Sequence, residues 1–106
     1  MAEDYRALNT YPAFKTFTAS ATGCTEILLP SACNQVSIGC DGTKLVMGQQ
    51  GFTEGDNLMT SQTDTAFIPS SNFLIIKLGK GMNRANSLFV QSSSGSVLVR
   101  VILEEA

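Results

Sequence analysis

The chain has 106 residues, of which 43% are hydrophobic and 15% charged, and its formal net charge is -2 at pH 7. This length suits a single domain with one core. Because the chain has no excess of basic residues, the composition excludes a protein that holds nucleic acid by charge, and we expect no nucleic-acid partner. A charged share below the usual value of about 25% is compatible with a surface that stands against other protein.

Residues 1–12 are mostly polar and end at a proline, which predicts a short N-terminal arm ahead of the folded domain. Acidic residues come early and no apolar run follows, so this segment does not have the pattern of a signal peptide. No stretch approaches the roughly 20 apolar residues of a membrane-spanning helix, and we expect no membrane partner. The aromatic residues of the arm, Tyr5 and Tyr11, either pack across a neighbouring subunit or belong to a disordered segment.

From residue 13 onward, short apolar runs alternate with Gly, Pro, Ser, Asn and Asp, the residues that end strands. No window combines helical spacing with a cap, and only 83–90 has room for a helical turn. We therefore predict one all-β domain over 13–106, a single β-sandwich or small barrel of about eight antiparallel strands. The predicted strands are 13–19, 25–29, 35–40, 43–49, 65–68, 72–79, 87–92 and 96–104. The segment 50–64 is predicted as a surface loop, with room for an edge strand at 57–60.

Two of these strands have more apolar residues than one core face needs. Side chains alternate between the two faces of a strand, and a sandwich strand requires only one apolar face. In the last strand, the face opposite the valines still carries Leu98 and Ile102, and in 72–79 the corresponding face carries Phe73 and Ile75. Either the chain's own loops or another subunit must cover them. These four residues and the two arm tyrosines are our candidate partner-binding residues.

The stretch SIGCDGTKLVMG places Cys40 beside Asp41 and Gly42, between two apolar runs. Asp-Gly between alternating runs is a strong signal for a hairpin with a type I′ turn. A reactive thiolate needs a neighbouring base or cation, and the sequence contains no histidine. We therefore interpret Cys40 as a buried residue at the end of a strand. We identify no catalytic residues and expect that the protein is not an enzyme.

The three cysteines, Cys24, Cys33 and Cys40, are spaced too loosely for a structural zinc site, and no histidine can complete one. We therefore expect neither a metal nor a cofactor. Their odd number is untypical of a secreted disulfide scaffold and indicates a protein made in a reducing cytoplasm. A disulfide between Cys24 and Cys33 stays open as an alternative.

A glycine-rich stretch, LGKGMNRAN, lacks the remaining residues of a phosphate-binding loop. It is interpreted as a connection between strands. A weak contact to a polyanion through Lys77, Lys80 and Arg84 is the alternative.

Three segments of the chain resemble small virion proteins of tailed bacteriophages: EILLPSACNQVSIGCDGTKLVMG, AFIPSSNFLIIKL and SLFVQSSSGSVLVRVILEE. The shared pattern begins with a strand that ends in Leu-Pro, a turn that contains Cys or Asn, and an Ile-Gly-x-Asp-Gly core. An Ile-Pro step into another strand follows, and then a Ser-Gly turn into a Val-rich terminal strand. The resemblance covers about residues 25–104, and the cysteines are not part of the pattern.

The resemblance implies a jelly-roll-like β-sandwich that acts as a capsid decoration (cement) protein. Such proteins bind at junctions between major capsid subunits, commonly as homotrimers. The implied partners are the major capsid protein or other virion proteins, and the implied location is the virion, after assembly in the bacterial host cytoplasm. A neck, tail or fibre component with a host-surface or glycan-binding role is the alternative, although sugar-binding grooves usually present exposed aromatics and this chain has no tryptophan.

Overall fold

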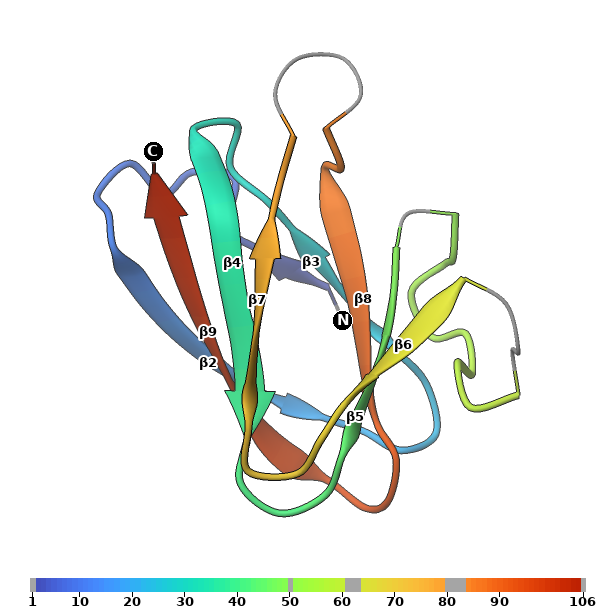
Figure 1. Cartoon of the computed structure of the whole chain (residues 1–106). Helices are drawn as coiled ribbons and strands as arrows, with labels where there is room; N and C mark the ends of the chain where they lie inside the picture. Colours follow the sequence, from blue (N-terminus) through green and yellow to red (C-terminus); the bar gives the residue numbers. More distant parts are fainter. Residues whose placement is uncertain (1, 50, 61–63, 80–83, 106) are drawn as a thin grey trace.

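The computed structural model describes residues 2–49, 51–60, 64–79 and 84–105, and these residues form nine strands and no helix. Figure 1 shows two sheets that face each other across a common core. The strands are β1 (Glu3–Asp4), β2 (Ala13–Ala19), β3 (Thr25–Leu28), β4 (Cys33–Cys40), β5 (Leu45–Gly48), β6 (Thr65–Ile68), β7 (Phe73–Lys77), β8 (Ser87–Ser92) and β9 (Val97–Glu105). None of the described residues belongs to a helix that could cross a membrane. The predicted all-β sandwich is confirmed.

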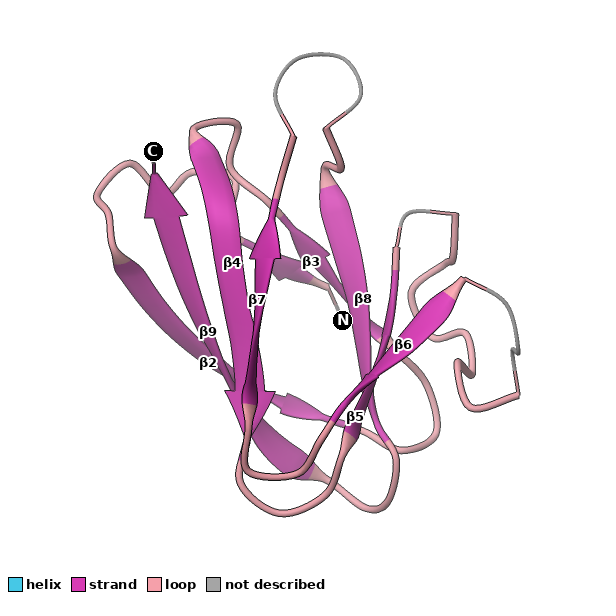
Figure 2. Ribbon diagram, viewed as in Figure 1, coloured by secondary structure: helices cyan, strands magenta, loops and turns pink. Residues whose placement is uncertain are grey.

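The two sheets are built from nested strand pairs. The five-stranded sheet has the order β1-β3-β8-β5-β6, and the four-stranded sheet has the order β2-β9-β4-β7. β2 pairs with β9, β3 with β8, β4 with β7 and β5 with β6, and all four pairs are antiparallel. From β2 to β9 the chain therefore follows one long antiparallel hairpin that is rolled across both sheets, as Figure 2 shows.

The core lies between the sheets and is filled by alternate residues of the strands. On β4 and β9 the inward residues are those that the alternation predicts: Val36, Ile38, Cys40, Val99, Val101 and Leu103, each 4% exposed or less. Each fully buried aliphatic side chain contributes about 1.5–3 kcal/mol relative to an exposed one. This packing makes the sandwich a rigid support for its outer surfaces.

The first residues of the chain are part of the sandwich, which corrects the prediction of an arm at 1–12. β1 pairs in parallel with β3, and the Tyr5 amide donates a hydrogen bond of 3.0 Å to the Leu28 carbonyl. The Tyr5 side chain is 6% exposed and belongs to the core, and Tyr11 packs against the same core. Both rings therefore contribute apolar area to the chain's own core. The hypothesis that Tyr5 reaches a neighbouring subunit is therefore wrong.

The Cys40 stretch forms a turn, as predicted, but it does not form a hairpin. β4 and β5 belong to different sheets, so the turn carries the chain from one sheet to the other. Gly42 has a φ of +120°, whereas Asp41 is not among the residues with a positive φ. A type I′ turn needs a positive φ at both central residues and is therefore not present. Cys40 itself is buried at the strand end, as expected.

Two smaller predictions also differ from the structure. Residues 58–60 form a turn, so no edge strand is present at 57–60. Residues 87–92 form β8, as predicted, so the helical turn for which 83–90 has room is not present in 87–90, and residue 83 is outside the described residues. At 87–90, the pairing of β8 with β3 and β5 overrides a weak local preference.

Candidate functional site

The outer face of the four-stranded sheet is apolar and exposed. We call this surface the open face. It consists of the outward residues Phe14, Thr16 and Thr18 on β2, Leu98, Arg100, Ile102 and Glu104 on β9, Gln35, Ser37 and Gly39 on β4, and Phe73, Ile75 and Lys77 on β7. Four of its apolar side chains are large and exposed: Phe14 at 72%, Ile75 at 60%, Phe73 at 48% and Leu98 at 46%. An apolar surface of this kind marks a contact with another molecule.

Part of the outer face of the other sheet is covered by the chain itself. Phe52 and Leu58, from the segment 51–60, pack against Val46 and Phe89 of that sheet and form a second small core. The rings of Phe52 and Phe89 meet edge to face, with centroids 6.1 Å apart. We expected either the chain's own loops or another subunit to cover the extra apolar residues. Within the described residues, the chain covers part of the five-stranded sheet and leaves the open face of the four-stranded sheet exposed.

The strand register arranges most of the open face in three rows across the sheet. The middle row, which we call the apolar row, consists of Phe14, Ile102, Ser37 and Ile75. The row on one side, the arginine row, consists of Thr16, Arg100, Gly39 and Phe73. The row on the other side, the carboxylate row, consists of Glu104, Gln35 and Lys77. The apolar row thus has the positive charge of Arg100 on one side, and the negative charge of Glu104 and the positive charge of Lys77 on the other.

Gly39 allows the Phe73 ring to lie close to the backbone of β4. A Cβ atom at position 39 would be 2.7 Å from the Cδ1 atom of Phe73, which is closer than real contacts allow. The ring instead borders a shallow pocket of about 240 Å³, with Phe14 on the far side and Arg100 in the wall. Two phenylalanines with an arginine between them are a composition that protein interfaces favour.

The charges of the open face differ in how they are satisfied. The Nε2 atom of Gln35 donates a hydrogen bond of 3.0 Å to Oε1 of Glu104. Among the residues that the structure describes, Arg100 is exposed and has neither an ion pair nor a hydrogen bond to its side chain. Its guanidinium is therefore available to a carboxylate from another molecule.

The structure brings four of the six sequence-predicted partner-binding residues together. Phe73, Ile75, Leu98 and Ile102 all lie on the open face. The two arm tyrosines do not belong to it. Phe14, the most exposed of the large hydrophobic residues, was not among the predicted partner-binding residues. The signal was present, because alternation in AFKTFTA puts Phe14 on the same face as the two threonines.

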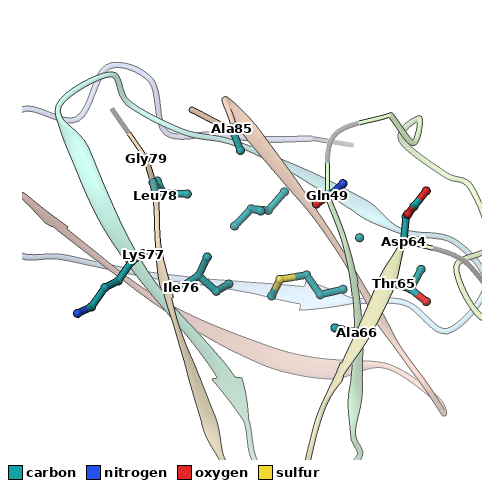
Figure 3. Close-up of a pocket in the computed structure, with 12 residues that line it drawn as sticks. Gln49, Asp64, Thr65, Ala66, Ile76, Lys77, Leu78, Gly79 and Ala85 are labelled. Atoms are coloured by element: carbon teal, nitrogen blue, oxygen red, sulfur yellow. The ribbon is translucent and has the colours of Figure 1, made fainter. Parts of the chain in front are cut away.

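A larger pocket of about 520 Å³ opens between the two sheets, beside β7 (Figure 3). Its walls include Met47, Ile76 and Leu88, and Asp64 is the carboxylate among its described lining residues. The side chain of Lys77 points away from the pocket. Its described lining residues include no aromatic ring on which a sugar could stack.

The three cysteines are buried, free thiols, and each donates a hydrogen bond from its Sγ atom to a backbone carbonyl. Burial raises the pKa of Cys24 and of Cys40, and the charge of Asp41 raises the pKa of Cys40 further. A raised pKa keeps these groups in the unreactive thiol form. Within the described ranges no group of three or more His, Cys, Asp or Glu side chains is placed to hold a metal ion.

The guanidinium of Arg84 supports the turn before β4. Its Nη2 atom donates hydrogen bonds of 2.6 Å to the carbonyls of Pro30 and Cys33, and its Nε atom donates a further one of 3.1 Å to Cys33. Lys80 lies outside the described residues. Because Arg84 is engaged in this way, the alternative of a polyanion contact loses one of its three cations.

Comparisons of the chain with protein-family models, with curated proteins and with solved structures find no match. What the protein does must therefore be inferred from its own surfaces. Of these, the open face is the surface whose composition and exposure most strongly indicate a partner.

Proposed function

We propose that this protein is a non-enzymatic structural component of a tailed-bacteriophage particle, namely a capsid decoration (cement) protein that stabilises the shell at junctions between major capsid subunits. The observation that carries the proposal is the open face. It is an apolar surface on a rigid sandwich, and Phe14 and Ile75 stay mostly exposed on it. Such a surface is suited to a permanent place against other protein.

The strand order supports the jelly-roll-like architecture that the resemblance implies. An eight-stranded jelly roll contains two four-stranded sheets and two Greek keys. Here β2-β9-β4-β7 faces β3-β8-β5-β6, with β1 added at one edge. Viral capsid proteins and lectins both use this architecture, so the fold agrees with a virion protein without excluding the glycan-binding alternative.

Binding through the open face requires little ordering of the protein. Its side chains project from paired strands, so their backbone is fixed before binding, and pre-organised surfaces lose less entropy on association. The exposed parts of Phe14 and Phe73 supply apolar area, and each phenylalanine side chain can bury roughly 150–250 Å². A cement protein multiplies such contacts, because it touches several capsid subunits at once and gains affinity from multivalency.

The test is co-sedimentation with capsids assembled from the major capsid protein of the same phage. We expect the wild-type protein to pellet with expanded capsids and to bind free capsid subunits much more weakly, because the bridging geometry exists only after assembly. Moderate salt should weaken the attachment little, since the contacts are mainly apolar and hydrogen-bonded. Failure of the wild-type protein to pellet with capsids at every salt concentration overturns the proposal.

Two serine substitutions test whether the open face takes part. Phe14→Ser removes an exposed ring from the open face, and we expect capsid affinity to fall by about tenfold. Phe67→Ser is the matched control, because Phe67 is 56% exposed but lies on β6 of the other sheet. Equal affinities for the two variants would show that the open face has no part in attachment.

The neck, tail or fibre component stays the alternative function. It would pellet with tails or fibres and not with capsids. A glycan-binding role would in addition require a sugar site. The larger pocket has no aromatic residue among its described lining residues, and the smaller one, which Phe14 and Phe73 line together with Arg100, lies within the open face.

A further inference from the structure

On β9, one positive and one negative charge lie at equal distances from the centre of the open face. On β9, Arg100 precedes Ile102 by two residues and Glu104 follows it by two. Residues two apart on a strand are separated by about 6.7 Å and point to the same side. A positive and a negative charge therefore flank the apolar row at equal distances, on opposite sides.

This arrangement is self-complementary for one particular symmetry. A two-fold axis that relates two packed faces must lie in the plane between them. If the axis crosses the strands above Ile102, the arginine row of each copy lies over the carboxylate row of the other. Arg100 of each copy then faces Glu104 of the other, so this pair forms twice, and the two apolar rows lie against each other. The same axis sets Lys77 opposite Phe73 of the second copy, which is a favourable pair of a cation and an aromatic ring.

A two-fold axis that runs along β9 instead of across it is electrostatically unfavourable. A two-fold axis that runs along the strands sets equivalent rows opposite each other. Arg100 would then approach Arg100 of the second copy, and Glu104 would approach Glu104, so like charges would meet across the interface. Like-charge contacts across an interface are costly and select against the arrangement that produces them.

We propose that the open face binds the open face of a second copy of this chain, through a two-fold axis that crosses β9 at Ile102. This inference rests on the proposed function in so far as it takes the open face to be a protein-contact surface. Because both contacts use the same surface, the two-fold dimer is a form of the free protein and must dissociate where the open face binds a capsid. It is also a different assembly from the homotrimer that the resemblance implies. Each copy supplies the carboxylate that the unpaired Arg100 of the other lacks. The two four-stranded sheets then pack as the layers of a sandwich do, about 10 Å apart and within about 30° of alignment.

The size of the open face sets the expected strength of the contact. Four strands at about 4.8 Å spacing and six residues of about 3.3 Å each give a projected area of roughly 400 Å². A standard interface buries about 800 Å² of accessible surface on each partner. The flat face alone is thus at the small end, and we expect a dimer with a dissociation constant of about micromolar size.

Charge exchange tests the pairing directly. The experiment measures the mass of the full-length protein by sedimentation velocity over a concentration series from about 1 to about 200 µM. Arg100→Glu and Glu104→Arg each place like charges opposite each other, and each should raise the dissociation constant by about tenfold or more. The double variant Arg100→Glu/Glu104→Arg restores opposite charges and should return the constant to about the wild-type value. Restoration requires contact between copies, because the two residues are four apart on one strand.

The controls separate this pairing from general effects of charge. Lys44→Glu reverses an exposed charge at the other sheet and should leave the dissociation constant unchanged. Circular dichroism confirms that each variant is folded. A monomer at every concentration, a trimer, or a double variant as weak as the single variants overturns the two-fold contact.

Sedimentation of the same samples with capsids distinguishes a failure of the two-fold contact from a failure of the proposed function. A monomeric protein that still pellets with capsids overturns the two-fold contact and keeps the cement function. A dimer that does not pellet with capsids keeps the contact and overturns the cement function.

Discussion

Gln91 shows how one buried polar side chain attaches a loop to the sandwich. Its Oε1 atom accepts a hydrogen bond of 2.6 Å from the amide of Leu58, and its Nε2 atom donates bonds of 2.9 Å to the Ala21 carbonyl and to Oδ1 of Asn57. The side chain is fully buried in β8. Because a buried amide must have its partners, Gln91 fixes the segment 51–60 over the five-stranded sheet.

We expect Gln91→Leu to lower the free energy of unfolding by about 2–3 kcal/mol, since it leaves the buried amide of Leu58 without an acceptor. Urea denaturation measures the change. Gln49→Leu is the control at an exposed position and should change the free energy by less than about 0.5 kcal/mol. Equal effects of the two substitutions would contradict the assigned role of Gln91.

At the same scale, the nature of Cys40 could be predicted from the sequence, but the surroundings of Tyr5 and Phe14 could not. The absence of histidine and the position at a strand end were enough to identify Cys40 as a buried thiol. Tyr5 has no periodic neighbours, and only the pairing of β1 with β3 shows that its ring enters the core. Phe14 had a signal in the alternation, but a single residue on a polar face is easily taken as incidental.

At the scale of elements, all eight predicted strands are present, and their ends differ by at most two residues. Alternation and turn residues are local signals, so they locate strands well. They do not say to which sheet a strand belongs. The Asp41–Gly42 turn is the clearest case, because its local sequence favours a hairpin and yet it joins strands of different sheets. β1 was missed because a pair of acidic residues, Glu3–Asp4, carries no strand pattern.

The contribution of β1 leads to a prediction about the N-terminal segment. Tyr5→Ala removes a core ring and should lower the free energy of unfolding by about 3–4 kcal/mol, as for other buried aromatic residues. Arg6→Ala is the neighbouring control, since Arg6 is exposed and its ion pair with Asp4 lies at the surface. It should leave the urea midpoint unchanged. A midpoint that Tyr5→Ala also leaves unchanged would show that the segment is a detachable arm.

At the scale of the whole molecule, the two outer faces have different uses. The segment 51–60 covers part of the outer face of the five-stranded sheet, while Phe14, Phe73 and Ile75 stay exposed on the outer face of the four-stranded sheet. Their exposure could be anticipated from the extra apolar residues in the sequence, but the match between the arginine row and the carboxylate row could not. Within β9 the spacing of Arg100 and Glu104 is visible in the sequence, but only the register of β4 and β7 places Lys77 and Phe73 in these rows.

The central claim is that this sandwich is a structural part of a phage shell, and the most direct measurement is its position on the intact particle. Electron cryomicroscopy of particles that contain the protein should show its density on the outer shell, at the junctions between major capsid subunits. Particles that lack the protein should show the same shell without that density. Density confined to the neck, the tail or the fibre tips would contradict the claim.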